Sequence, residues 1–491
     1  MVQSRHLDPQ LAGRLNELLR FCKRRGASYA DARFQETTHE QLVVENGALD
    51  TCAVTISAGM GLRVIVDGSW GFAASALLTP AALQRAAQVA LAAAKASSRI
   101  NRTPVTLAPV APARGQFRGP CVIDPFTVPL SSKLEYLLWA CDVLHRHRLI
   151  KTAIATLDFY RIRKRFVSTE GSDIAQEFIE SGGHLEAIAS AHDEVQVRSY
   201  PASHRSALAQ AGYEYVKAID LVGGAERTRH EAVALLSAKE LRGGELTVIL
   251  DSSQMALQIH ESCGHPVELD RVLGTELSFA GGSFLTPDKR GHFQYGSPLV
   301  SIVADATVPG GLGTMFFDDE GVSAQQHDII RNGTFVGYLS SRETAPRVGL
   351  AESSGAMRAE DWDVPPLIRM TNINLEPGDG SLAQLLKDTK RGVYLGTNKS
   401  WSIDDQRLNF QFSTEIGWEI RKGKLGAMIK NPIYTGITPL FWRQCTAVAG
   451  PTEWKLWGLP NCGKGEPGQS MHVGHGASPA RFANVRVGRG T

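Results

Sequence analysis

The first part of the chain alternates helical and strand-like patterns. Residues 8–25 place apolar side chains at helical spacing, and a basic end before Gly26 suits a helix C-terminus. A second helix is expected at about 80–97. Strand-like segments lie at 29–35, 41–45, 52–56 and 61–66. Asn46-Gly47 supplies a hairpin turn between the second and third of these strands.

Residues 101–130 are rich in proline and predict a linker or an extended connection across the surface. Helical patterns resume at 131–147 and again at 217–238. A meander of strands is expected between them, at 152–160, 165–169, 175–180 and 184–190. The first half is therefore predicted to be α+β.

The pattern changes at the turn Leu241-Arg242-Gly243-Gly244, which leads into an apolar strand at 245–250. From Pro298 onward, short strands alternate with glycine and proline breaks, which indicates an antiparallel sheet or an open barrel. We therefore expect an α+β protein with two domains. The first is a mixed α/β domain at 1–240, and the second is a β-rich domain at 241–491 that carries the functional helix.

Composition narrows the function classes. The 491 residues are 43% hydrophobic and 21% charged, and 52 Lys and Arg stand against 50 Asp and Glu. A formal charge of +2 gives no large field for nucleic acid or an anionic membrane. The N-terminus lacks a signal-peptide pattern, and no run of 18 uncharged apolar residues occurs. A cytoplasmic protein without nucleic-acid or membrane partners is expected.

The seven cysteines show no disulfide-framework or zinc-ribbon spacing. They are Cys22, Cys52, Cys121, Cys141, Cys263, Cys445 and Cys462. Most of them are expected to be reduced, buried fillers.

The strongest chemical signal is the segment 254–265, expected to be a helix that carries His260, Glu261 and His265. Histidines four apart lie about 40° apart around an α-helix, but histidines five apart lie about 140° apart. Both can bind one ion only if the helix bulges or ends between them. Gly264 can leave helical geometry cheaply, and Pro266 disfavours the α conformation at His265. The alternative is a pair of ordinary histidines beside an incidental surface charge.

Two imidazoles are too few for a catalytic zinc, which usually has three protein ligands and one open position. Glu268 and Asp270, which lie near His265 in the sequence, are possible sources of the third ligand. Cys462 lies in a glycine-rich segment, expected to be a loop, that lets a metal approach a thiolate closely.

Several motifs in the second half of the chain resemble the motifs of one known protein family. H-E-x-x-G-H at 260–265 is followed by Asp270, Gly274-Thr275, Ser278-Phe279, Asp318-Asp319-Glu320-Gly321, Arg369-Met370-Thr371-Asn372, Cys462-Gly463-Lys464, Gly468-Gln469-Ser470 and Val473-Gly474. These motifs resemble the TldD/PmbA family over about residues 240–490. The N-terminal layout is also similar.

The resemblance implies a zinc metallopeptidase with zinc on His260, His265 and Cys462 and with Glu261 activating the bound water. It also implies unfolded or extended peptides bound as an added strand. Asn372 is a candidate for that edge, or a plain sheet residue. The family pairs a metal-bearing subunit with a metal-free TldE/PmbA-like relative, so a homodimer or heterodimer with a partly closed zinc cavity is expected.

Two questions stay open from the sequence. His472 and His475 are either solvent-exposed loop histidines or side chains that approach the ion or substrate. Rival functions are a cysteine-type hydrolase with Cys462 as nucleophile, and a non-catalytic scaffold that binds peptide or zinc.

Overall fold

The computed structural model describes residues 5–205 and 207–489. The first half contains η1 (Arg5–Leu7), α1 (Pro9–Arg24), β1 (Tyr29–Glu45), β2 (Ala48–Val66), β3 (Ser69–Ser75), α2 (Pro80–Ser98), β4 (Arg114–Arg118), η2 (Pro125–Thr127), α3 (Leu130–His145), β5 (Ile150–Ser168), β6 (Asp173–Ala191), β7 (Glu194–Tyr200), β8 (Leu208–Ala209), α4 (Tyr213–Ile219), α5 (Leu221–Leu235) and β9 (Lys239–Glu240).

The second half begins with β10 (Gly244–Leu250), α6 (Ser252–Ile259), η3 (His260–Gly264), η4 (His265–Val267), α7 (Leu269–Val272), η5 (Pro287–Lys289), β11 (Ile302–Asp305), β12 (Gln326–Arg331), β13 (Thr334–Phe335), α8 (Thr344–Arg347), β14 (Met357–Arg358) and β15 (Leu367–Ile368). It continues with β16 (Asn372–Leu375), α9 (Leu382–Lys387), β17 (Arg391–Ile403), β18 (Asn409–Arg421), β19 (Lys424–Lys430), β20 (Pro432–Ile437), α10 (Thr438–Arg443), β21 (Cys445–Val448), η6 (Pro451–Glu453), β22 (Lys455–Lys464), β23 (Gln469–Ala477) and β24 (Ala480–Arg489).

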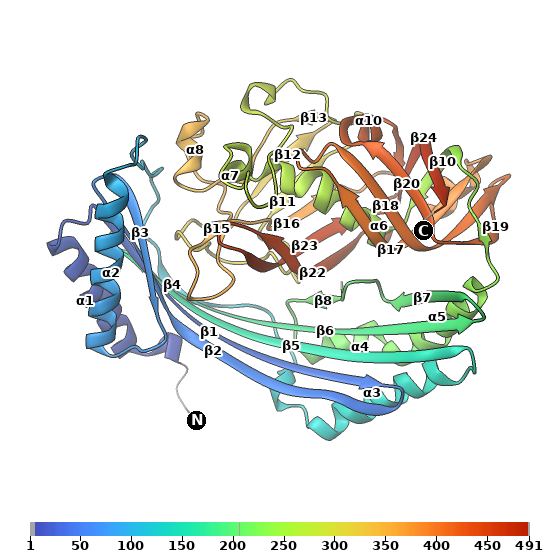
Figure 1. The fold of residues 1–491 in the computed structure, drawn as a ribbon, viewed down its shortest axis with the longest axis horizontal. Coiled ribbons are helices and arrows are strands. Elements are labelled where there is room, and N and C mark those ends of the chain that lie inside the picture. The colour runs from blue at the N-terminus through green and yellow to red at the C-terminus, as the bar shows by residue number, and fades with distance from the viewer. Residues whose placement is uncertain (1–4, 206, 490–491) are drawn as a thin grey trace.

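A long, curved sheet forms the base of the molecule, in the order β3-β2-β1-β5-β6-β4, with β7 and β8 also paired to β6. Side chains of α3, α4 and α5 share one hydrophobic core with β1, β5 and β6. A separate core joins α1 and α2 to β1, β2 and β3 at one end. The second half lies on the opposite, concave face of the long sheet (Figure 1).

The four longest strands correct the sequence prediction, which divided each of them into two short strands. Each runs unbroken for 17 to 19 residues. In β1, the two glutamates between the predicted strands are paired: Glu36 with Arg163 of β5 at 3.1 Å, and Glu40 with Lys133 of α3 at 2.8 Å. The expected turn at Asn46-Gly47 is confirmed, and both residues have positive φ.

The helix expected at 217–238 is also wrong in its extent, because two helices replace it. Asp220 adopts a left-handed φ of 51°, which breaks the helix between α4 and α5. Its side chain then accepts a hydrogen bond from the Gly223 N–H and so caps α5.

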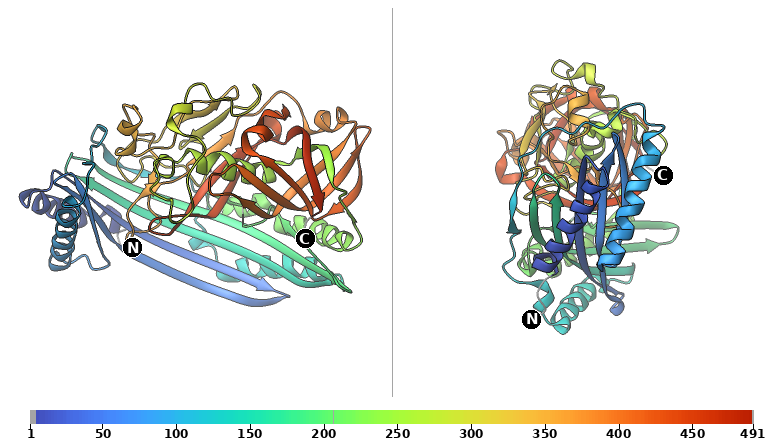
Figure 2. Two further views of the ribbon diagram at one scale, coloured as in Figure 1. Left: turned by 45° about the horizontal axis from the view of Figure 1, so that its top comes forward. Right: turned by 90° about the vertical axis from the view of Figure 1, so that its left-hand side faces the viewer.

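The β-rich second half is confirmed. Its pairings close a five-stranded barrel, because β17, β10, β24, β20 and β18 follow one another and β18 pairs again with β17. A second sheet has the order β13-β12-β11-β16-β23-β22. Two further views show this half resting on the long sheet (Figure 2).

The core of the second half surrounds α6, whose Met255 and Ile259 are fully buried with Cys263. The segment that follows α6 is therefore held between the barrel and the second sheet, where β23 and β22 contact α6. None of the helices in the described part of the chain is long and apolar enough to span a membrane.

Candidate metal centre

The helix that leads into the site starts at the end of a barrel strand. β10 ends at Leu250, and the Asp251 carboxylate accepts a hydrogen bond of 2.7 Å from the Gln254 N–H. This is an N-cap, which fixes the first turn of α6. Helix α6 ends at Ile259, and His260–Gly264 form one turn of π-helix.

The π turn resolves the spacing of the two histidines. The His265 N–H donates to the His260 carbonyl oxygen, which is the i→i+5 bond of a π-helix. That bond brings residues five apart to one side of the helix, so the expected bulge is confirmed. The expected reason is partly wrong, because Gly264 and His265 both keep α-region dihedrals. A Cβ at Gly264 would instead overlap the buried sulfur of Met370.

Cys462 comes to the histidines from the C-terminal end of the chain. It lies on β22 in a hairpin with β23, rather than in the loop that the sequence indicated. One ligand atom from each of His260, His265 and Cys462 lies within 4.8 Å of the others. The Cys462 Sγ is 3.7 Å from the His265 Nε2, and the two imidazole rings are 4.8 Å apart and nearly perpendicular. The three predicted ligands therefore converge.

Hydrogen bonds fix which nitrogen of each imidazole is free. The His265 Nδ1 lies 2.9 Å from the Glu268 carboxylate, which can only accept, so the His265 Nε2 is left as the ligand atom. The His475 Nδ1 donates to the Ile373 carbonyl oxygen at 3.2 Å. The His475 Nε2 therefore accepts from the His260 Nδ1 at 2.8 Å, and the His260 Nε2 is free to bind a metal.

The first alternative for His472 and His475, exposed loop histidines, is wrong. Both lie on β23, and His475 is fully buried behind His260. His472 faces another part of the molecule and binds the Glu180 carboxylate at 2.6 Å. Strand alternation and the close pairing of β22 and β23 place them there, and the glycine-rich sequence hid this pattern.

Burial and neighbouring charges set the protonation of the donors. Burial lowers the pKa of His260 below its usual 6.5 and lowers that of His265 further, so both are neutral ligands near pH 7. Burial raises the pKa of the Cys462 thiol, but His265 and Arg369 outweigh that effect and bring it below 9.0. These directions favour metal binding, which needs neutral imidazoles and a thiolate.

Glu261 lies in the same cavity, which has a volume of about 200 Å³. Its carboxylate accepts a 2.7 Å hydrogen bond from the Arg407 guanidinium. Arg407 has a left-handed φ of 62° in the turn between β17 and β18. Leu257 and Trp401 supply apolar walls, and the His204 ring packs edge-on against Trp401 at 5.2 Å.

The structure places Asn372 away from any strand edge. It is fully buried on β16, which is paired with β11 on one side and β23 on the other. Its amide nitrogen donates to the Asp305 carbonyl oxygen at 2.7 Å, and its Oδ1 accepts from the Gly313 N–H at 3.0 Å. Asn372 is a structural residue, and the interpretation as a peptide-binding edge is wrong.

Sequence reasoning missed the residues that support the ligands. Glu268 lies only three residues after His265, but it has extended backbone beyond the predicted helix, so helical spacing does not identify it as a partner of His265. Arg407 comes from a turn 146 residues away from Glu261, and nothing in the sequence points to it.

Comparisons with known proteins find metallopeptidase relatives of this chain. The family model of the PmbA/TldA metallopeptidase C-terminal domain matches residues 243–489, and that of PmbA/TldA metallopeptidase domain 1 matches residues 30–94. A metalloprotease of Methanocaldococcus jannaschii is 28% identical over 453 residues, which cover 92% of this chain and 95% of the relative. A metalloprotease TldD homolog of Haemophilus influenzae is 26% identical and covers 94% of this chain and 93% of its own.

A zinc metalloprotease TldD homolog of Saccharolobus solfataricus is 25% identical over 252 residues, half of this chain and 52% of the relative. Two solved structures share the fold. A candidate modulator of DNA gyrase from Thermotoga maritima has a TM-score of 0.77 at 19% identity, with 97% of this chain and 99% of the other covered. TldE from Thermococcus kodakarensis has a TM-score of 0.73 at 16% identity, with 97% and 100% covered.

Proposed function

The chain belongs to the TldD/PmbA family of metallopeptidases, and on that premise we propose that it is a zinc-dependent peptidase that hydrolyses unfolded or extended peptides. His260, His265 and Cys462 would hold the zinc, and Glu261 would act as general base. The observation that carries the proposal is the convergence of these three donor groups beside Glu261 in one cavity.

The donor set fits zinc. Two imidazoles and one thiolate are ligands that zinc prefers, and three protein ligands leave the fourth position open for catalysis. Both free nitrogens are fixed by partners on the far side of each ring, Glu268 and His475. Such outer partners raise ligand basicity and orient the ring.

Each residue of the site would have its own role in peptide hydrolysis. Bound zinc supplies a Lewis acid that polarises a peptide carbonyl and lowers the pKa of water. Glu261 accepts the proton of the attacking water and returns it to the leaving amine. Arg407 holds the Glu261 carboxylate in place through their 2.7 Å ion pair. Leu257 and Trp401 limit the access of bulk water.

One arrangement favours the rival reading as a cysteine-type hydrolase. Cys462, His265 and Glu268 follow one another at 3.7 Å and 2.9 Å, in the order nucleophile, base and orienting carboxylate. That reading gives no role to His260 or to its hydrogen bond with His475. The zinc proposal uses all of these groups.

The deciding experiment is hydrolysis of a labelled, unfolded peptide by the purified protein. We expect activity that disappears with a chelator and returns when zinc is added back. Activity that persists after complete metal removal would favour the cysteine hydrolase. A protein that binds zinc and peptide but never cleaves would be a scaffold.

We further propose that the active species is a dimer in the cytoplasm, either of two identical chains or of this chain with a TldE/PmbA-like subunit. The family resemblance and the fold shared with TldE support the pairing. A partly closed zinc cavity would exclude folded proteins without a selective pocket. Size measurement of the chain, alone and with a TldE-like partner, tests this, and a fully active monomer contradicts it.

A further inference from the structure

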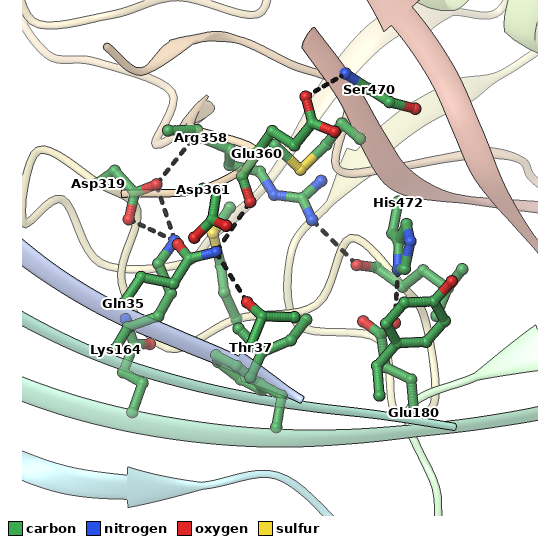
Figure 3. A pocket seen from close by; sticks show the side chains of 18 of the residues that line it. Gln35, Thr37, Lys164, Glu180, Asp319, Arg358, Glu360, Asp361, Ser470 and His472 are labelled. Atoms are coloured by element: carbon green, nitrogen blue, oxygen red, sulfur yellow. Dashed lines mark hydrogen bonds and ion pairs between the residues drawn. The ribbon is translucent and has the colours of Figure 1, made fainter. Parts of the chain in front are cut away.

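A second and larger cavity, of about 620 Å³, lies between the concave face of the long sheet and the second half of the chain. Gln35 and Thr37 of β1, Lys164 of β5 and Glu180 of β6 form its floor. Loops of the second half and the start of β23 form its roof, where Glu360, Asp361 and His472 are labelled (Figure 3).

Carboxylates dominate the charges of this cavity. Five line it, Glu180, Asp319, Glu360, Asp361 and Asp363, against the two cations Lys164 and Arg358. Lys164 is already neutralised by Asp319, at 2.6 Å. Arg358 donates to the carbonyl oxygens of Met370 and Leu312, at 2.9 and 3.1 Å. The charge that remains is negative.

Two polar atoms of the cavity walls that lack a hydrogen-bond partner also favour a ligand that donates hydrogen bonds. Gln35 and Gln210 are only 2% and 3% exposed, and both line the cavity. Their amide nitrogens donate to the carbonyl oxygens of Glu360 and Thr314, at 2.8 and 2.6 Å, which fixes the orientation of each amide. Both Oε1 atoms are left without a hydrogen-bond partner. A buried acceptor of this kind needs a donor from a ligand or water.

The cavity is close to the metal centre. Pro460 of β22 lines the large cavity, and its neighbours Asn461 and Cys462 line the metal cavity. A small cavity of about 30 Å³ shares Tyr160 and Pro460 with the large one. Its Arg205 belongs to the segment whose Ala202 and His204 line the metal cavity. The three cavities follow one another between the two halves of the chain.

We propose that the large cavity is a distal subsite for a positively charged group of the peptide, an ammonium or guanidinium. This inference rests on the proposed peptidase function and adds a substrate class, peptides with a basic residue or a free N-terminus away from the scissile bond. The carboxylates supply the attraction, and the unpartnered Oε1 of Gln35 would accept an N–H donor. The volume accommodates a short peptide segment around the charged group.

The test measures equilibrium binding of fluorescent peptides to the Glu261→Gln variant at low ionic strength. The peptides share one alanine-rich and serine-rich sequence with a single lysine, norleucine or glutamate. Each is made with a free and with an acetylated N-terminus, which separates a lysine side chain from the terminal ammonium. We expect lysine or the free terminus to bind about three- to tenfold more tightly than the neutral counterpart, and salt to reduce this difference.

A variant with altered cavity walls tests whether the carboxylates of the large cavity cause any preference for basic peptides. Glu360 and Asp363 are exposed enough to be changed without unfolding the chain, so the double variant Glu360→Gln and Asp363→Asn is the main test. Glu352→Gln, an exposed carboxylate outside the cavity, is the matched control. The preference should fall in the double variant and persist in the control.

Equal binding of the lysine and norleucine peptides, with no gain from a free terminus, would overturn the inference. Tighter binding of the glutamate peptide would also overturn it and would point to Arg358 as an anion site. Hydrolysis by the unmodified protein is measured with the same peptides. Cleavage without a basic preference would refute only the subsite, whereas no cleavage with a clear binding preference would refute only the peptidase.

Discussion

The His265 N–H donates to the carbonyl oxygen of His260, so a single π-type hydrogen bond joins two histidines that are five positions apart in the sequence. An ideal α-helix would turn the second histidine about 140° away from the first. The π turn brings both rings to 4.8 Å of each other and toward Cys462. The backbone at 260–264 thus shapes the candidate metal site.

Gly264→Ala should damage this turn. The added Cβ would overlap the Met370 side chain, which is itself fully buried, so the turn or the methionine must move. We expect a loss of about 1–3 kcal/mol in the free energy of unfolding and reduced zinc content. Gly13→Ala is the matched control. It also replaces a glycine inside a helix, but the added Cβ meets nothing within 4 Å. Equal stability of the two variants would contradict the role of the close contact.

The ligand assignment predicts zinc stoichiometry. The purified protein should hold about one zinc per chain, and His260→Ala, His265→Ala and Cys462→Ser should each lose most of it. Elemental analysis measures the zinc, and Cys52→Ser at an exposed cysteine serves as control. Full retention of zinc by the Cys462 variant would remove that residue from the site.

The sequence identified the predicted metal ligands better than the residues that hold them in place. His260, Glu261 and His265 share one short segment, so local spacing identified them, and only the family motif connected Cys462 to them. Arg407 and His475 act through contacts across 146 and 215 residues, which no local pattern encodes. β1 is continuous although Glu36 and Glu40 lie in its middle, because ion pairs with Arg163 and Lys133 satisfy both carboxylates, and no local pattern encodes those partners.

His475→Phe should weaken zinc binding without removing a ligand. The ring would still fill the buried space, but the acceptor for the His260 Nδ1–H would be lost, and the His260 tautomer would no longer be fixed. We expect the zinc dissociation constant to rise about 10- to 100-fold, measured by competition with a chelator. His472→Phe, on the same strand but bound to Glu180, should leave zinc affinity unchanged. Similar effects of both variants would indicate general damage to β23.

Glu261→Gln separates metal binding from catalysis. The amide is similar in size and can still contact Arg407 through its carbonyl oxygen, but it cannot take a proton. Peptide hydrolysis should fall by about 10²- to 10⁴-fold while the zinc content stays that of the unmodified protein. Loss of zinc in this variant would show that Glu261 supports the metal instead.

The buried His184 predicts a pH dependence of stability that is independent of the metal. Burial, with a smaller effect of Arg205, lowers its pKa from 6.5 to about 4. Between these values the unfolded chain binds a proton that the folded chain does not, so stability should fall as pH decreases from about 6.5 to 4 and change no further below that range.

This histidine accounts for at most about 3 kcal/mol. Burial and the neighbouring Glu320 raise the pKa of Asp318, which contributes the opposite slope, so the measurement must be a difference between two proteins. Chemical denaturation of the protein and of His184→Asn at pH 8, 6.5, 5.5 and 4.5 should show the variant losing less stability on acidification. Parallel pH profiles would mean that His184 is protonated in the folded chain and that its surroundings admit water.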